Sequence, residues 1–150
     1  AGAVTVGGAD IRNLPLSELS EKISYVSQDN FLFNCSLKEN IRLGNPNATD
    51  EEVYAAAKAA CCDEFISRLE NGYDTYCTPE IFSQGQWQLL SIARAAVAEP
   101  KLLLLDEITA NLDAETEKAV LAALKRVAKD RTVISISHRT SAELGRTIQI

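Results

Sequence analysis

The feature that most constrains the fold is residues 82–113, together with the strand pattern that follows them. Four consecutive leucines (102–105) precede two acids, and such a continuous apolar run predicts a strand covered on both faces. Asp113 then begins a helix, and the β-branched segment 132–137 is a second strand. Strand, helix and strand within roughly 35 residues form a βαβ unit. We therefore predict an α/β fold built on a parallel sheet.

Helix-start patterns predict that the chain is helical from residue 36 to about residue 94. In each pattern a Ser or Thr is followed three residues later by Glu or Gln, which is a capping box. Gly44 suits the position just after the first of these helices. The three capping boxes are Ser36 with Glu39, Thr49 with Glu52, and Ser83 with Gln86. The remaining expected strands are residues 3–6, 23–27 and 146–150.

The overall composition is that of a soluble globular protein, with 46% apolar and 24% charged residues. A net charge of −6 argues against nucleic acid as a partner, because phosphate backbones require a basic surface. No apolar run approaches the roughly 18 residues of a membrane span. A link to a membrane is therefore expected only through another chain or domain.

The cysteines do not predict a metal site. They form no CxxC pair, and the chain has a single histidine, so a zinc site is not expected. The simplest interpretation is that they are small apolar residues in a reducing cytosol. The four are Cys35, Cys61, Cys62 and Cys77.

Asp106 and Glu107 stand at the expected carboxyl end of the four-leucine strand. Ligands of open parallel sheets bind beyond the carboxyl ends of the strands. Two adjacent acids at this position are costly unless they bind a cation or another partner, so both are candidate site residues. The alternative is an ordinary strand end with two solvated acids.

Several further segments are arranged as in one family of nucleotide-binding domains. The segment SQGQ (83–86) opens a helix, where unpaired N–H groups and the helix dipole can face an anion. It resembles the signature loop L-S-G-G-Q of ABC transporters, with Gln84 in place of the first glycine. The other matching segments are Gln28 in YVSQDNFLF (Q-loop), Asp106-Glu107 (Walker B), residues 110–113 (D-loop) and His138 in ISHR (switch histidine). The chain thus resembles the ATP-binding domain of ABC transporters over essentially its whole length.

This resemblance implies a fold, two ligands and a role for each matching residue. The fold is a P-loop NTPase, with a RecA-like parallel-sheet core of residues 1–34 and 96–150 and an inserted helical subdomain of residues 35–95. The ligands are ATP and Mg²⁺. The resemblance makes Glu107 and His138 catalytic, assigns Mg²⁺ to Asp106 and Gln28, and assigns ATP to Gln28, Ser83, Gln84, Gly85, Gln86 and Asp113.

The resemblance also implies partners and a location. In the family the signature loop binds the γ-phosphate of an ATP held by a second ATP-binding domain, and the Q-loop senses a transmembrane domain. The chain is therefore expected to work as part of a dimer on the cytoplasmic face of the cell membrane. Residues 36–95 are most similar to exporter domains.

A P-loop of the form G-x-x-x-x-G-K-[ST] is not found in the sequence. Gly2 and Gly7 have the required spacing, but Gly8 and Ala9 follow where Lys and Ser or Thr belong. In the family the P-loop lies just upstream of the residue that matches Ala1, so we expect an N-terminally truncated piece of a longer protein. By itself it should hold ATP poorly, should not hydrolyse it, and should be marginally stable or self-associating because its sheet has open edges.

Two other functions fit parts of the pattern. The first is a non-catalytic half of a heterodimeric transporter that contributes only its signature loop; the presence of Glu107 and His138 argues against it. The second is a chromosome-maintenance or DNA-repair ATPase. Those relatives carry a long coiled coil between the Q-loop and the signature, and the short interval here shows no heptads.

Overall fold

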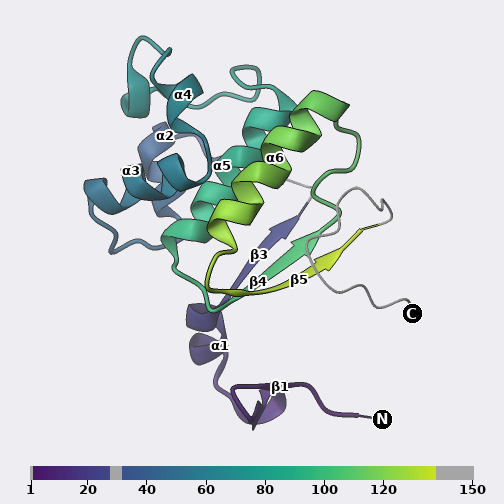
Figure 1. Cartoon of the computed structure of the whole chain (residues 1–150). Helices are drawn as coiled ribbons and strands as arrows, with labels where there is room; N and C mark the ends of the chain where they lie inside the picture. The colour runs from purple at the N-terminus through teal and green to yellow at the C-terminus, as the bar shows by residue number, and fades with distance from the viewer. Residues whose placement is uncertain (1, 28–31, 138–150) are drawn as a thin grey trace.

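The computed structural model describes residues 2–27 and 32–137, and its larger sheet has three parallel strands (Figure 1). Ser27 pairs with Asp106 and Asp106 with Ile136, so the carboxyl ends of the three strands meet at one edge. This confirms the predicted parallel sheet and βαβ unit. The strands lie in the order β3 (Ile23–Ser27), β4 (Leu102–Asp106) and β5 (Thr132–Ile136).

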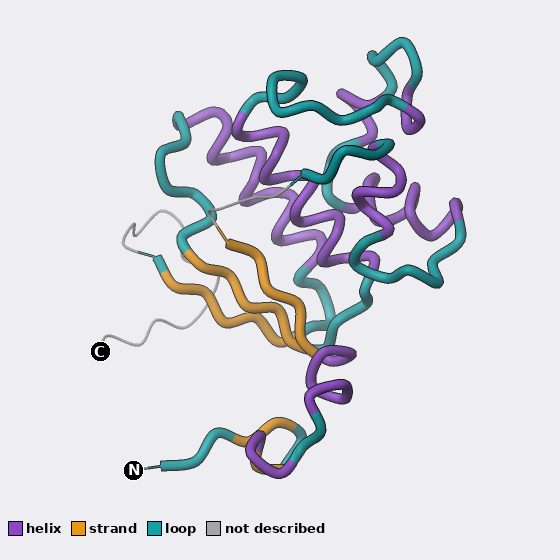
Figure 2. The backbone as a smooth tube through the Cα atoms, turned by 180° about the vertical axis from the view of Figure 1, so that it is seen from behind, coloured by secondary structure: helices purple, strands orange, loops and turns teal. Residues whose placement is uncertain are grey.

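Two long helices, α5 (Gln84–Val97) and α6 (Ala114–Val127), lie together over one face of this sheet (Figure 2). Three shorter helices contribute to the same core, of which two pack directly against α5 and the third packs against one of those two. Within the described ranges, no helix combines the length and the apolar composition needed to cross a bilayer. The shorter helices are α2 (Leu37–Arg42), α3 (Asp50–Ala59) and α4 (Asp63–Ile66).

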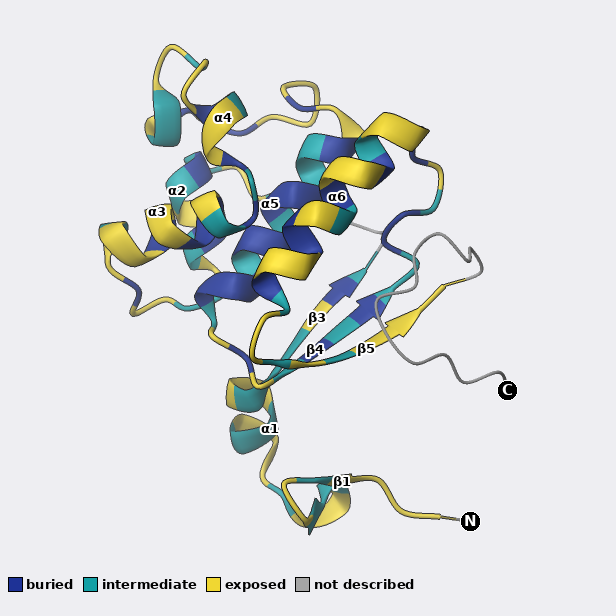
Figure 3. Ribbon diagram, in the orientation of Figure 1, coloured by how far each residue is buried: buried dark blue, intermediate teal, exposed yellow. Residues whose placement is uncertain are grey.

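The opposite face of the sheet is not covered by the described residues (Figure 3). Leu103 and Leu105 point into the core and are 0% and 2% exposed, whereas Tyr25 and Ile134 on the other face are 60% and 54% exposed. Side chains of a strand alternate between faces, so one helical layer buries only every second leucine. The expectation that the four-leucine strand is covered on both faces is therefore wrong for this part of the chain. Self-association through open edges stays a prediction.

The capping boxes form as predicted at two of the three helix starts. Reciprocal hydrogen bonds join Thr49 to Glu52 and Ser83 to Gln86. At α2, Ser36 Oγ accepts from the Glu39 N–H, but the Glu39 carboxylate does not return the bond. It pairs instead with the guanidinium of Arg42, one turn further along the helix.

The N-terminal residues form a small hairpin beyond the amino ends of the three strands (Figure 2). The strand expected over residues 3–6 is shorter, and the chain turns at Gly7-Gly8. Pro15 is the N-cap of a seven-residue helix that leads into β3. The expected strand 146–150 lies outside the described residues. The elements here are β1 (Thr5–Val6), β2 (Ala9–Asp10), the 3₁₀ helix η1 (Ile11–Asn13) and α1 (Leu16–Lys22); a second 3₁₀ helix, η2, spans Gly72–Asp74.

Candidate functional site

Asp106 ends β4 and lies at the carboxyl edge of the sheet, as predicted. The Tyr25 hydroxyl, on the neighbouring strand β3, donates a hydrogen bond to Asp106 Oδ2 at 2.9 Å. Tyr25 is the register partner of Leu104, so it shares a sheet face with Asp106. One carboxylate oxygen of Asp106 is thereby held in place by the adjacent strand. Sequence reasoning missed Tyr25; the signal was its place in an expected strand three residues before Gln28.

Glu107 begins a turn with a left-handed backbone, at φ 48°. Its N–H donates to the carbonyl of Ile136 at 2.9 Å, and its own carbonyl accepts from the Ala110 N–H at 3.0 Å. A non-glycine residue in this conformation costs on the order of 1 kcal/mol and persists only where its surroundings fix it. Here the bond to Ile136 fixes it, since that residue ends β5. The strained turn therefore places Glu107 at a defined position between the ends of β4 and β5.

Two predicted site residues, Gln28 and His138, lie outside the described residues. In the sequence Gln28 directly follows Ser27, the last residue of β3, and His138 comes two positions after Ile136, the last residue of β5. Their roles stay predictions.

The SQGQ segment forms the start of α5, as predicted. Ser83 Oγ accepts from the Gln86 N–H at 3.3 Å, and Gln86 Oε1 accepts from the Ser83 N–H at 3.0 Å. The Gln86 side chain is thus engaged in the cap, while Gln84 is exposed at the first helical position. The exposed end of a 14-residue helix presents its positive dipole end to solvent.

Thr116 joins the signature helix to the D-loop, and sequence reasoning did not single it out. Its N–H donates to Asp113 Oδ1 at 2.7 Å and its hydroxyl donates to Asp113 Oδ2 at 2.9 Å. Its methyl group lies against Gly85, where an added Cβ would be 2.1 Å from Thr116 Cγ2. Gly85 therefore has a packing reason to be glycine, in addition to any role at a phosphate. The starts of α5 and α6 are held side by side.

The Asp113 cap predicts a pH-dependent stability. Hydrogen bonds from the Thr116 backbone and then its hydroxyl lower the pKa of Asp113 below 3.8. A carboxyl group whose pKa is lowered in the folded state stabilises the fold at pH values above its unfolded-state pKa. This stabilisation is lost as the pH falls through the folded-state pKa. Asp113→Ala should therefore lower Tm at pH 7, and the difference from the wild type should shrink below about pH 4.

The matched control is Asp113→Asn, which keeps a capping oxygen but cannot titrate. Its Tm at pH 7 should lie much closer to wild type than that of Asp113→Ala. Thermal melts of all three proteins between pH 3 and pH 7 test this. An Asp113→Ala deficit that stays constant over that range would contradict the assignment.

Proteins of one family are similar to this chain over most of its length. A family model described as "ABC transporter" matches residues 1–110. The chain is 46% identical over 142 residues to the uncharacterized ABC transporter ATP-binding protein YknV of Bacillus subtilis, covering 93% of this chain and 24% of the relative. It is 47% identical over 142 residues to the multidrug resistance protein pgp-1 of Caenorhabditis elegans, covering 93% and 11% respectively.

A third relative carries an export function in its name. The beta-(1→2)glucan export ATP-binding/permease protein NdvA of Nitrobacter winogradskyi is 47% identical over 143 residues, covering 94% of this chain and 24% of the relative. The chain spans about a quarter or less of the length of these curated relatives. The motif positions, the sheet and the matches over most of the chain agree, and the chain belongs to the ABC transporter family.

Proposed function

We propose that the chain is the ATP-binding and ATP-hydrolysing part of an ABC exporter on the cytoplasmic side of a membrane. The observation that carries this proposal is the placement of Asp106 and Glu107 at the carboxyl edge of the sheet. Tyr25 holds the Asp106 carboxylate, and the bond to Ile136 fixes the backbone of Glu107. Two solvated acids at an ordinary strand end would not need either restraint.

The donor set at this edge suits Mg²⁺, which prefers carboxylate and amide oxygens together with water. Asp106 is the described donor, and Gln28 is the second proposed ligand. When bound, the ion neutralises charge on the phosphate oxygens of a nucleotide. Glu107 is proposed to orient the attacking water and accept its proton. His138 is proposed to contact the terminal phosphate.

The signature residues are proposed to act on an ATP held by a second ATP-binding domain. The starts of α5 and α6 lie together through Gly85, Thr116 and Asp113, so the signature and the D-loop share one surface. Gln84 and Gly85 offer backbone N–H groups there, whereas the Ser83 N–H is engaged by Gln86. A transmembrane domain is the other proposed partner, as the joint ATP-binding/permease name of the export relative suggests.

By itself this chain is expected to bind ATP–Mg²⁺ too weakly to detect at micromolar concentrations. Gly7 and Gly8 form the turn of a hairpin, and residues 2–27 hold no lysine in a glycine-rich loop that could cradle phosphates. Isothermal titration calorimetry checks this, with the complete ATP-binding domain of YknV as the positive control. Micromolar binding to the chain alone would refute the expectation.

The second candidate function is a non-catalytic half of a heterodimer. It is favoured by one observation, Gln84 in the place of the first signature glycine. The two candidates differ in what they predict for Glu107. The catalytic candidate requires its carboxylate for ATP hydrolysis, whereas a non-catalytic half does not.

A further inference from the structure

Two cysteines far apart in the sequence lie opposite each other on neighbouring backbone segments. The Leu37 N–H donates to the Thr75 carbonyl at 2.8 Å, and the Cys77 N–H donates to the Cys35 carbonyl at 3.0 Å. Between these bonds, Ser36 and Tyr76 form an isolated antiparallel bridge. In this register Cys35 is the direct partner of Cys77, so both side chains point to the same side of the pair.

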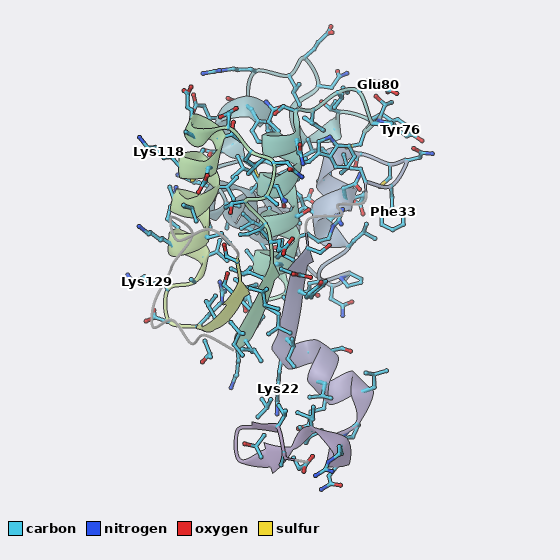
Figure 4. The ribbon with its side chains drawn as sticks, turned by 90° about the vertical axis from the view of Figure 1, so that its right-hand side faces the viewer. Lys22, Phe33, Tyr76, Glu80, Lys118 and Lys129 are labelled. Atoms are coloured by element: carbon cyan, nitrogen blue, oxygen red, sulfur yellow. The ribbon has the colours of Figure 1, made fainter. Side chains whose placement is uncertain are left out.

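The alternation expected of such a pair is visible in residues 74–78, where Thr75 and Cys77 are buried and Tyr76 between them is exposed. Tyr76 is 58% exposed, and Figure 4 shows it pointing outward. The Tyr76 hydroxyl donates to the Asn34 carbonyl at 2.8 Å and adds a further link between the segments. Cys77, by contrast, is 1% exposed, and Cys35 is half-buried.

The expected separation of such a pair suits a disulfide. Cys35 and Cys77 share one backbone hydrogen bond, and directly opposed residues of an antiparallel pair have Cα atoms about 4.5–5.5 Å apart, within the range of about 4.4–6.8 Å that disulfides require. Both sulfurs have polar neighbours: Asn40 Nδ2 donates to Cys35 Sγ at 3.3 Å, and the Cys77 thiol donates weakly to the Thr75 carbonyl at 3.9 Å.

The surroundings of the pair have opposing effects on the pKa values of the two thiols. The pKa of Cys35 is raised mainly by burial and to a smaller extent by the neighbouring Glu39. The pKa of Cys77 is raised to about 11, mainly by burial and to a smaller extent by the neighbouring Cys35. The nearby guanidinium of Arg94, which donates to the Asn40 carbonyl at 3.0 Å, lowers both pKa values by a smaller amount. The thiols are therefore mostly protonated at neutral pH, and exchange should accelerate as pH rises.

We propose that Cys35 and Cys77 are a modification site, a reversible disulfide pair oxidised by a low-molecular-weight disulfide such as oxidised glutathione. Cys35, the more accessible of the two, loses its proton to solvent and attacks one glutathione sulfur, which releases glutathione thiolate and leaves a mixed disulfide. Cys77 then loses its proton to solvent, and its thiolate attacks Cys35 Sγ and releases the second glutathione thiolate. The two glutathione thiolates take up the two protons from solvent. Two protein thiols are oxidised and one glutathione disulfide is reduced to two thiols, so the electrons balance. This site goes beyond the proposed ATPase function and does not depend on it.

Trypsin separates the cysteines cleanly, so peptide mapping tests the pairing in the wild-type chain. Cleavage after lysine and arginine places Cys35 in residues 23–38, Cys61 and Cys62 in residues 59–68, and Cys77 in residues 69–94. Folded protein is incubated with oxidised glutathione at pH 7 and pH 8.5, alkylated, digested and analysed by mass spectrometry. The expected product joins peptide 23–38 to peptide 69–94, forms faster at pH 8.5, and is reversed by dithiothreitol.

Two variants sharpen the test. Cys77→Ala should stop the reaction at one glutathione on Cys35, since the attacking thiol of the second step is gone. A variant with Cys61→Ala and Cys62→Ala should still form the cross-link, and its Tm should rise by at least roughly 5 °C on oxidation. The proposal is overturned by a cross-link to peptide 59–68, by stable glutathione adducts without a cross-link, by no reaction at pH 8.5, or by a cross-link that forms only in urea.

Discussion

Glu107→Gln, made in a full-length transporter that carries this chain, is expected to lower the rate of ATP hydrolysis at least about 100-fold. The substitution keeps the size of the side chain and removes its ability to accept a proton. The strained turn and its bond to Ile136 involve only the backbone of residue 107, so the fold should be retained. Phosphate release under saturating ATP–Mg²⁺ measures the effect, and ATP binding should remain close to that of the unsubstituted protein.

The control for this experiment is Glu51→Gln, an equivalent substitution at an exposed position in the first turn of α3. It should leave hydrolysis within about twofold of wild type, because exposed substitutions away from a site have small effects. A Glu107→Gln protein that hydrolyses ATP as fast as the Glu51→Gln control would contradict the catalytic assignment. It would favour the non-catalytic half, in which the only expected function of this chain is to present Ser83 and Gly85 to its partner.

Local patterns predicted much of the fold. The strand at residues 23–27 has the expected bounds, and the capping boxes at Thr49 and Ser83 start α3 and α5. These features depend on contacts within a few residues, which a sequence displays directly. The four-leucine run shows the limit of this reasoning. Its alternate burial depends on whether a second layer covers the sheet, which the run itself does not encode.

The contacts that position the site are long-range, and this is why sequence reasoning missed them. Tyr25 meets Asp106 only because β3 and β4 pair in one particular register. The contact of Thr116 with Gly85 depends on how two helices pack. The opposition of Cys35 and Cys77 follows the same rule, since the sequence shows no CxxC spacing and only a backbone bridge brings the two together.

Gly44→Ala is expected to destabilise the chain by about 1–3 kcal/mol, the usual cost of forcing extra atoms into a packed core. A Cβ at this position would lie 1.9 Å from the Arg94 carbonyl oxygen and 2.8 Å from Val97 Cγ1, so α2 would have to move away from α5. The sequence suggested a different reason, a helix-ending glycine. Gly44 is not among the residues with a positive φ, so close approach of the two helices, rather than backbone conformation, requires glycine here.

Urea or thermal unfolding of Gly44→Ala measures this cost, and Gly2→Ala is the matched control. Nothing lies within 4 Å of a Cβ added at Gly2, so that substitution should change stability by less than about 0.5 kcal/mol. The size of the Gly44 effect also tests how rigidly α2 is held against α5. Arg94 donates to the Asn40 carbonyl across the same junction, so a shift of α2 away from α5 should also weaken this hydrogen bond. Equal stabilities of the two variants would mean that the ends of α2 and α5 can separate at no cost, and the packing described for this junction would then be wrong.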